Sequence, residues 1–423
     1  MIELQITSMT HAGEGIGRHE GLAVFVPFAL PGELVRVEIV EQKKRFARAR
    51  LVEVVVPSAE RRVPRCPHHF QLAPPEGFDS STLSAACGGC QLQHLDYAGQ
   101  LAFKQRTVAE QLTRVGGLAD PPVRPILASP AAYDYRNHAR FSLTQAGRLG
   151  FWSADSRRVV AIRACHQIEP PLAELFRHVA VEPAQAPELE RVSLRAGADG
   201  ETLVVLEASL EGTPEVELDM SVDAALLRPD GASLALAGRD FVLMEVRGRP
   251  FRVSAGSFFQ VNTAMHEPLV DLVLQGLALA GGEVVLDLFC GVGLFTAFIA
   301  PVAGRVVGVE SFAPAVADAA VNLDEFENIE IYEAMVEAVL PGLEGPFDAV
   351  VLDPPRAGCT PQGLDALLAR PVARIVYVSC DPATLARDAK RLVAGGYALA
   401  WAQPLDMFPQ TYHVETVALF TRA

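Results

Sequence analysis

The sequence predicts a multidomain protein in which two β-rich parts precede a C-terminal doubly wound α/β domain. The chain has 423 residues, more than one hydrophobic core usually supports. Its first part alternates apolar and polar residues in short runs, whereas the part after about Arg252 alternates apolar strands with helices. We expect three domains, at residues 1–57, 58–250 and 251–423.

The first domain is predicted to be a small antiparallel β-barrel. Runs such as Ile2-Leu4-Ile6 and Leu22-Val24-Val26 alternate apolar with other residues, and glycines such as Gly13 and Gly15 break the runs. Barrels of this kind often bind oligonucleotides, but the same pattern is also found in protein-interaction barrels.

The net charge of −15 counts against nucleic-acid binding, which depends on phosphate contacts from Lys and Arg. The distribution of charge weakens this objection, because basic residues are concentrated near the end of the first domain. They are Lys43, Lys44, Arg45, Arg48, Arg50, Arg61, Arg62 and Arg65. A local basic face is one interpretation, and an ordinary charged surface is the other.

Four of the seven cysteines fall in or near a segment that is too thin to build its own core. They are Cys66, Cys87, Cys90 and Cys165, and two of them form Cys87-Gly88-Gly89-Cys90. Because no secretory signal precedes them, bound metal explains them better than disulfides do. Zinc is the general expectation for four thiolates and an iron–sulfur cluster is the alternative, and spacing does not decide between them.

A helix is expected over about 97–115, packed on the C-terminal domain, and further strands should complete the central domain. The chain contains no run of eighteen apolar residues and no N-terminal targeting pattern. We therefore expect a cytoplasmic protein without a membrane span.

The α/β domain opens with a glycine turn that is typical of a cofactor site. The apolar strand Val284–Leu288 leads into Phe289-Cys290-Gly291-Val292-Gly293, and the next strand ends at Glu310, whose carboxylate can accept hydrogen bonds from ribose hydroxyls. A dinucleotide fingerprint would need a third glycine where Thr296 stands, so S-adenosylmethionine fits better. A tight turn without a ligand is the alternative.

Two further strands are followed by residues that can take part in catalysis. Asp353-Pro354-Pro355-Arg356 follows one strand, and Arg356 stands where amino-methylating enzymes place an aromatic residue. Cys380 directly follows the strand Arg374–Ser379, at the same edge of the sheet. A cysteine in such a turn is predicted to act as a thiolate nucleophile.

Candidates for a general base lie just before the last strand. Glu415 is our choice and His413 is the alternative, although a lone histidine is more often structural. Near the start of the domain, Gln260 is placed to contact a cofactor and Phe258 to stack a flipped base. An aromatic residue at a domain junction more often serves packing alone.

Taken together, these motifs resemble the iron–sulfur-containing RNA (uracil-5-)-methyltransferases, in particular the 23S ribosomal RNA branch. The similarity runs nearly end to end: Gly13-Glu14-Gly15-Ile16-Gly17 looks like the TRAM RNA-binding barrel, and Cys87 to His94 looks like the cluster motif. Ser379-Cys380-Asp381-Pro382 and Phe408 to Glu415 match the nucleophile and base signatures, which are the most specific of these motifs.

The resemblance implies that the protein methylates C5 of a uridine in 23S rRNA, with Cys380 as nucleophile and Glu415 as base. It also implies that a single chain suffices, and that S-adenosyl-L-methionine is bound by Gln260, Phe289, Leu294, Glu310 and Asp353. A [4Fe–4S] cluster would be held by Cys66, Cys87, Cys90 and Cys165.

The sequence departs from the family pattern at three places. Twenty residues separate Cys66 from Cys87, where the family has a handful; Leu294 replaces a polar residue; and Met335 stands where an acid or amide meets the adenine. Three alternatives remain: a tRNA uracil-5-methyltransferase, a cytosine-5-methyltransferase using a second cysteine such as Cys359, and a non-catalytic RNA-binding protein.

Overall fold

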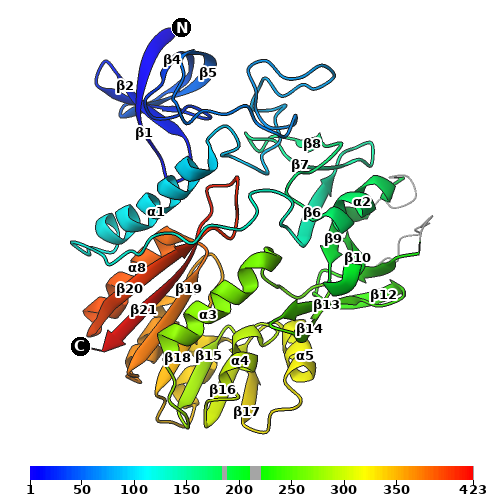
Figure 1. Cartoon of the computed structure of the whole chain (residues 1–423), viewed down its shortest axis with the longest axis vertical. Coiled ribbons are helices and arrows are strands. Elements are labelled where there is room, and N and C mark those ends of the chain that lie inside the picture. Colours follow the sequence, from blue (N-terminus) through cyan, green and yellow to red (C-terminus); the bar gives the residue numbers. More distant parts are fainter. Residues whose placement is uncertain (183–187, 210–220, 423) are drawn as a thin grey trace. The chain divides into compact units, whose positions relative to one another are not determined.

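The structure, a computed structural model, describes residues 1–182, 188–209 and 221–422. The chain folds into two compact units (Figure 1). The first consists of residues 1–103, 141–166 and 408–412, and the second consists of 104–140, 167–407 and 413–423. The barrel and the cysteine-rich segment thus share one unit, while the boundaries expected at 57 and 250 remain predictions.

The first unit begins with a closed five-stranded barrel whose strand order is β1-β2-β3-β5-β4. Its strands are β1 (Ile2–Met9), β2 (Gly15–His19), β3 (Leu22–Val26), β4 (Leu34–Gln42) and β5 (Phe46–Val56). The predicted barrel is confirmed, with one difference: β3 pairs with β5 in parallel, whereas the other pairs are antiparallel. Alternating side chains such as Leu4, Ile6, Val35 and Val37 fill the interior, as the period of two requires.

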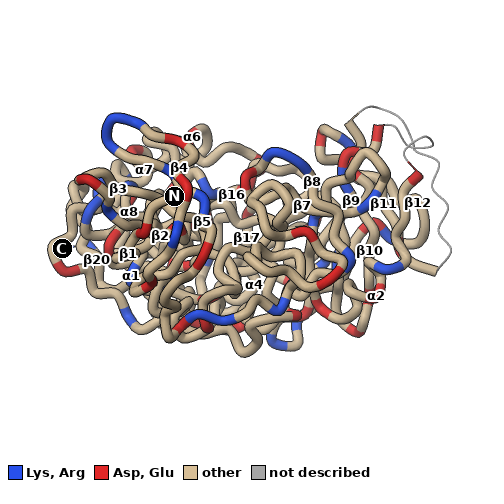
Figure 2. The backbone as a smooth tube through the Cα atoms, turned by 90° about the horizontal axis from the view of Figure 1, so that it is seen from above, with Lys and Arg blue, Asp and Glu red and all other residues tan. Residues whose placement is uncertain are grey.

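Most of the predicted basic cluster is engaged in ion pairs with acidic residues. Arg48 lies 2.7 Å from Glu14 and Arg62 lies 2.9 Å from Asp96. Figure 2 shows basic and acidic residues close together around the barrel strands. The remaining pairs of this kind are Lys43–Glu41, Arg50–Glu38 and Arg61–Glu33. The basic stretch therefore presents less uncompensated positive charge than its sequence indicates.

The rest of the first unit surrounds the cysteine-rich segment. Helix α1 (Tyr97–Arg114) begins here and continues into the second unit at Lys104; it has nearly the predicted length. Strand β6 (His138–Leu143) also crosses the division between units and leads into the hairpin formed by β7 (Leu149–Trp152) and β8 (Val159–Ala161).

The N-terminal part of the second unit is β-rich, as predicted. Four strands follow one another in the order β12-β11-β10-β9, and β13 pairs with β14 as a separate antiparallel hairpin. The elements are α2 (Pro170–His178), β9 (Leu189–Ala196), η1 (Ala198–Gly200), β10 (Thr202–Ala208), β11 (Asp223–Leu227), β12 (Ser233–Ala237), β13 (Phe241–Val246) and β14 (Arg249–Ser254).

The C-terminal part of the second unit is a seven-stranded sheet in the order β17-β16-β15-β18-β19-β21-β20. The first five strands in this order pair in parallel, and β21 is antiparallel to both of its neighbours. The strands are β15 (Val284–Leu288), β16 (Arg305–Glu310), β17 (Ile329–Glu333), β18 (Ala349–Leu352), β19 (Arg374–Ser379), β20 (Tyr397–Leu405) and β21 (Glu415–Arg422).

Helices cover both faces of this sheet (Figure 1), which confirms the doubly wound prediction. Gly276 of α3 lies against the Val376 side chain on one face, and the hydroxyl of the next residue, Tyr377, donates a hydrogen bond to Asp388 of α8 on the other. The helices are η2 (Thr263–Met265), α3 (His266–Leu277), α4 (Leu294–Ile299), α5 (Ala313–Asn322), α6 (Val336–Val339), η3 (Leu340–Gly342), α7 (Pro361–Leu368) and α8 (Pro382–Ala394).

Residues upstream of this domain also join its core. Val108 and Leu112 of α1 belong to the same buried cluster as β15, β18 and β19. The segment after α1 runs beside β20, where the Arg124 and Leu127 amides donate hydrogen bonds to β20 carbonyls. This segment covers the unpaired edge of β20, a common solution to the exposure of edge strands.

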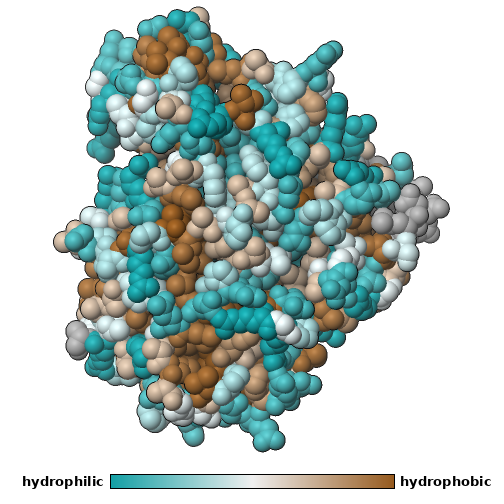
Figure 3. Space-filling model, in the orientation of Figure 1, coloured by the Kyte–Doolittle hydropathy of each residue, from teal (hydrophilic) through white to brown (hydrophobic). Residues whose placement is uncertain are grey.

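Hydrophilic residues cover much of the face drawn in Figure 3, with hydrophobic patches between them, as is normal for a globular surface. Among the residues described, no helix combines the length and the apolarity that a membrane span requires.

Candidate active site

The predicted site residues lie near the point where the strand order of the sheet reverses. β16 lies on one side of β15 and β18 lies on the other. Open α/β sheets bind ligands at such a switch point, beyond the carboxyl ends of the strands. The turns after β15, β18 and β19 carry Phe289, Asp353 and Cys380, so these three residues follow the ends of three neighbouring strands.

The pairing of β19 with β21 brings the predicted nucleophile and base opposite each other. Ser379 pairs with Thr416 in the antiparallel register, so the next positions along this ladder are Cys380 and Glu415. Side chains that face each other across antiparallel strands lie within reach of contact. Sequence reasoning placed Cys380 at the cofactor edge of the sheet and Glu415 just before the last strand, and the antiparallel register of β21 explains why the two lie close together.

Local sequence fixes the position of Cys380. The carboxylate of Asp381 caps α8 by accepting hydrogen bonds from the Ala383 and Thr384 amides at 2.8 and 3.0 Å, and Pro382 occupies the first turn. Cys380 is therefore held in the last position before a well-defined helix start, half-buried at the end of β19.

Arg356 is the cation of this site. Burial, Glu415 and Asp353 raise the pKa of the Cys380 thiol to about 12, while the charge of Arg356 and its hydrogen bond act in the opposite direction. The Arg356 guanidinium also lies 2.9 and 2.8 Å from the two ring nitrogens of His413. Arg356 is the group that opposes the cost of forming a Cys380 thiolate.

The two candidate bases have opposite electrostatic environments. Burial, Arg356 and other cations lower the pKa of His413 to about 3, which makes it a weak base. Burial and Asp353 hold the pKa of Glu415 well above its usual range. Once ionised, Glu415 binds a proton far more tightly than His413 does, and this difference favours Glu415 as the base.

Acidic side chains also converge on the glycine turn. The Glu310 carboxylate accepts hydrogen bonds from the amides of Gly291, Ser311 and Phe312 at 3.0, 2.7 and 2.8 Å. Burial, Asp287 and Glu310 raise the pKa of Asp353 to about 7. A carboxylate has about four acceptor positions and three are used here, so Glu310 can accept one further hydrogen bond, from a ligand's hydroxyl group.

The backbone geometry of the glycine turn agrees with the expected close approach of a ligand to the backbone. Gly291 and Gly293 both have positive φ angles, of 56° and 89°. A Cβ at Gly293 would lie 2.8 Å from Leu323, so a side chain is excluded there, whereas the space around Gly291 is open. Gly291 therefore leaves room for a ligand to approach the backbone.

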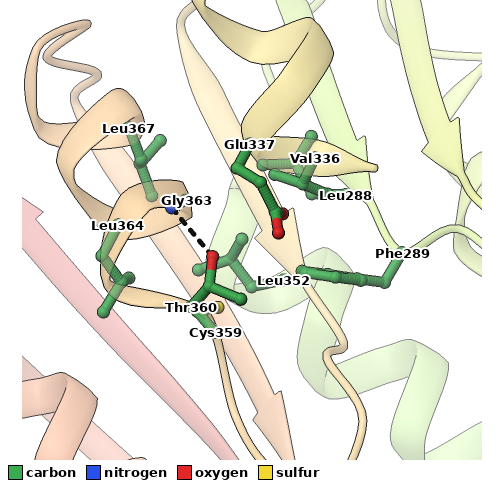
Figure 4. Close-up of a pocket in the computed structure, with 10 residues that line it drawn as sticks. All are labelled: Leu288, Phe289, Val336, Glu337, Leu352, Cys359, Thr360, Gly363, Leu364 and Leu367. Carbon is green, nitrogen blue, oxygen red and sulfur yellow. Dashed lines mark hydrogen bonds between the residues drawn. The ribbon is translucent and has the colours of Figure 1, made fainter. Parts of the chain in front are cut away.

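A small apolar pocket lies next to this turn (Figure 4). The ring of Phe289 forms part of its wall, and the Glu337 carboxyl group and the Thr360 hydroxyl point toward it. Thr360 also accepts a hydrogen bond from the Gly363 amide at 3.0 Å. The other lining residues are Leu288, Val336, Leu352, Cys359, Gly363, Leu364 and Leu367.

Sequence reasoning missed Glu337 and Thr360 as cavity residues. Each lies at the first turn of a helix, and Thr360 precedes Pro361, a helix-start signal that was available in the sequence. Cys359, considered as the second cysteine of a cytosine enzyme, lines this cavity, and burial raises the pKa of its thiol to about 12.

The remaining predicted residues of the second unit are placed by other contacts. Gln260 is buried, and its carbonyl accepts hydrogen bonds from Asn137 and His266 at 3.1 and 2.8 Å. Leu294 is the buried first residue of α4. The ring of Phe258, by contrast, is 64% exposed.

The four cysteines predicted to bind metal all lie in the first unit. Burial is the main cause of the raised pKa of Cys66, Cys87 and Cys90, and Cys165 adds to it at each of the three. This mutual influence means that the four thiols are neighbours. In the ranges described, no three His, Cys, Asp or Glu side chains have an arrangement suited to a single metal ion.

The fold and the site together define a methyltransferase with an RNA-binding type of barrel at its N-terminus. Residues 232–423 match the family described as tRNA (uracil-5-)-methyltransferase, and residues 1–52 match the TRAM domain. The chain is 35% identical to an uncharacterized RNA methyltransferase of Gloeobacter violaceus over 100% of its own length and 96% of the relative's. An uncharacterized RNA methyltransferase of Thermosynechococcus vestitus is also 35% identical, over 99% and 98%.

A solved structure gives the same result. The tRNA (uracil-54, C5)-methyltransferase of Pyrococcus abyssi, in complex with S-adenosyl-L-homocysteine, has a TM-score of 0.73 and 26% identity. The similarity covers 99% of this chain and 100% of that one. The chain therefore belongs to the uracil-5 RNA methyltransferase family, with an N-terminal TRAM domain, and it is an RNA methyltransferase.

Proposed function

We propose that the protein uses S-adenosyl-L-methionine to methylate C5 of a specific uridine in 23S rRNA, giving 5-methyluridine. The observation that carries this proposal is the proximity of Cys380 and Glu415, one residue beyond the last pair of β19 with β21, beside Arg356 and Asp353. A non-catalytic RNA-binding protein has no use for a half-buried thiol next to a buried carboxyl group.

In the proposed reaction, the Cys380 thiolate adds to C6 of the uracil, and the electron pair of the C5–C6 bond becomes available at C5. The cofactor supplies an electrophilic methyl group, which C5 accepts. Glu415 then removes the C5 proton, the C5–C6 double bond re-forms and the thiolate leaves. Arg356 stabilises the thiolate both before it attacks C6 and when it leaves.

The residues around the glycine turn fit this cofactor. Glu310 offers a carboxylate oxygen for a ribose hydroxyl, Gly291 leaves open space, and the residues that line the pocket beside Phe289 are mostly apolar. We propose Gln260, Phe289, Leu294, Glu310 and Asp353 as cofactor contacts.

The donor set in the first unit fits an iron–sulfur cluster. The four thiols are buried or half-buried, and Cys165 lies close enough to raise the pKa of each of the other three. The thiolates of a [4Fe–4S] cluster bind four different iron atoms, so they need a wider arrangement than the ligands of a single ion. We propose Cys66, Cys87, Cys90 and Cys165 as the cluster ligands, with a structural role.

A tRNA uridine is the second candidate substrate, because the Pyrococcus abyssi protein that resembles this chain over its whole length is a tRNA enzyme. The test is methyl transfer from labelled cofactor to rRNA and tRNA from cells that lack this protein, with the nucleoside identified by mass spectrometry. 5-Methyluridine in 23S rRNA supports the proposal, and 5-methyluridine in tRNA alone moves the protein to the second candidate.

Two variants test the mechanism separately from the substrate. Cys380→Ala should lower methyl transfer by more than about a thousand-fold, because the nucleophile is lost. Glu415→Gln should instead accumulate a methylated protein–RNA adduct, because the C5 proton cannot leave. The matched control is His413→Asn, which should turn over; full activity of Cys380→Ala would refute the mechanism.

A further inference from the structure

An aromatic side chain at the surface of the first unit has no role in the proposed chemistry. Trp152, the last residue of β7, is 52% exposed. Exposed tryptophans are uncommon, because the indole ring loses much of the benefit of burial and it binds other flat rings well. Figure 1 shows β7 and β8 as a hairpin, and Trp152 stands where the chain leaves β7.

Strand alternation directs Trp152 away from the interior of the unit. The ring of the preceding residue, Phe151, packs against buried Phe141 with centroids 4.9 Å apart. Successive side chains of a strand point to opposite faces, so Trp152 occupies the other face. Its cross-strand partner is Val159, and the next pair on this face is Gly150 with Ala161. These small neighbours leave the indole accessible.

The segment that carries this tryptophan is positively charged. Residues 141–166 contain four arginines and one acid, Asp155, which gives the segment a net charge of +3 in a chain of −15. Arg148 lies in the turn before β7, and Arg157 and Arg158 lie in the turn after it; all three are exposed. The fourth arginine is Arg163, just beyond β8.

Backbone carbonyls hold two of these arginines in place. The Arg158 guanidinium donates a hydrogen bond to the Ser84 carbonyl at 2.7 Å, and that of Arg163 donates one to the Gly77 carbonyl at 3.2 Å. Arg157 faces Asp155 at 3.5 Å, but its side chain is 82% exposed. By contrast, many of the barrel's basic residues are paired with carboxylates.

We propose that the β7–β8 hairpin is a docking surface for an unpaired stretch of the substrate RNA. The Trp152 indole stacks one base, and Arg148, Arg157 and Arg158 contact the phosphates on either side. An exposed aromatic ring between cations is the arrangement that binds single strands without reading their sequence. The inference rests on the proposed function only in taking RNA as the substrate.

Tryptophan fluorescence tests the stacking directly, because the chain has two tryptophans. Trp401 is 8% exposed and lies under the Arg124 guanidinium, so Trp401→Phe leaves Trp152 as the only emitter. Titration of that variant with a uridine-rich single-stranded oligonucleotide should quench its emission. The same titration of Trp152→Phe, whose emission comes from Trp401, should show no quenching.

Binding measurements on the full-length protein give a second test. Trp152→Leu keeps an apolar side chain but removes the stacking ring, and it should weaken binding of the single strand on the order of ten-fold. Trp152→Phe should retain most of the affinity. Arg157→Gln should reduce the slope of log affinity against log salt by about one.

The outcomes separate this proposal from the proposed function. Unchanged affinity of Trp152→Leu, together with no quenching in Trp401→Phe, overturns the docking surface even if the wild-type protein methylates RNA. Weaker binding by Trp152→Leu and quenching in Trp401→Phe would uphold the docking surface. If the wild type then transferred no methyl group, the proposed function would be refuted. Equal quenching by duplex RNA would also refute the proposal, because paired bases cannot stack on the ring.

Discussion

Cys380 in the second unit and the clustered cysteines in the first unit lie in different electrostatic environments. In the second unit, burial and two carboxyl groups raise the pKa of Cys380, and Arg356 opposes them with a full positive charge and a hydrogen bond. In the first unit, burial and neighbouring thiols raise the pKa of Cys66, Cys87 and Cys90, and the opposing groups are polar backbone groups and the Gln93 side chain.

This difference separates two kinds of cysteine site. A thiol that must become a thiolate during a reaction needs a permanent cation nearby, and Cys380 has one. A set of thiols that binds iron receives its positive charge from the metal, so the protein need only bring the thiols together. The two kinds of site therefore differ in the source of the compensating positive charge, which is Arg356 in one and bound iron in the other, and each source can be removed by substitution.

The largest effect is expected in the first unit. Cys87→Ala should abolish iron content and the visible absorption of a cluster, because one of four ligands is lost. The matched control is Cys359→Ala, which removes a buried thiol from the second unit and should leave iron and absorption unchanged. Purification without oxygen, followed by iron and sulfide assays, provides the measurement. Absence of iron from the wild-type protein would refute the cluster assignment.

A second large effect is expected for the buried ion pair between Lys104 of α1 and Asp406, which directly follows β20. Lys104 and Asp406 are both fully buried and paired with each other. Lys104→Met leaves the Asp406 charge uncompensated, which should lower the free energy of unfolding by about 3–5 kcal/mol. The control is Arg305→Met, which breaks an exposed pair with Glu330 and should cost less than about 1 kcal/mol.

Denaturant unfolding of both variants measures the difference. Equal destabilisation by the two changes would show that burial does not raise the importance of the Lys104–Asp406 pair.

The fold was largely predictable because its signals are local. The alternation in β1 to β5 and the apolar strands β15, β16, β18 and β19 are visible without tertiary information. The strands β17 and β20 were not predicted, and both lie at edges of the sheet. Edge strands carry mixed polar and apolar residues, so they lack the continuous apolar run that marks a buried parallel strand.

The identity of the main site residues could be predicted from the sequence, but the contacts and charges around them could not. Positions at strand ends identified Cys380, Glu415 and Asp353. The interaction of Arg356 with Cys380 and His413 depends on the path of the turn after β18, which no spacing rule gives. Likewise, the basic stretch near the barrel looked like a nucleic-acid surface because its carboxylate partners come from distant positions such as Glu14 and Asp96.

Arg356 is expected to control the reactivity of Cys380. Arg356→Gln removes the charge and the hydrogen bond that lower the thiol's pKa, so methyl transfer at neutral pH should fall by about 10- to 100-fold. Arg356→Lys keeps the charge without the planar guanidinium and should recover part of the loss. Steady-state kcat and KM on the same RNA provide the measurement. A change confined to KM would show that Arg356 binds RNA and does not activate the thiol.

The smallest expected effect is the change in rate of the wild-type enzyme for each pH unit. The thiolate of Cys380 is required, and its pKa is raised to about 12, so the reactive fraction should grow by about ten-fold for each pH unit across the neutral range. The raised pKa of Glu415 acts in the same direction, because its carboxylate form also increases with pH. His413, with a pKa of about 3, is already neutral throughout this range and adds no slope. Single-turnover rates between pH 6 and 9 should therefore rise without a maximum. Arg356→Gln should give lower rates than the wild type at each pH in this range with the same slope, because the thiol then loses its opposing cation. A flat profile in both proteins would mean that thiolate formation does not limit the rate.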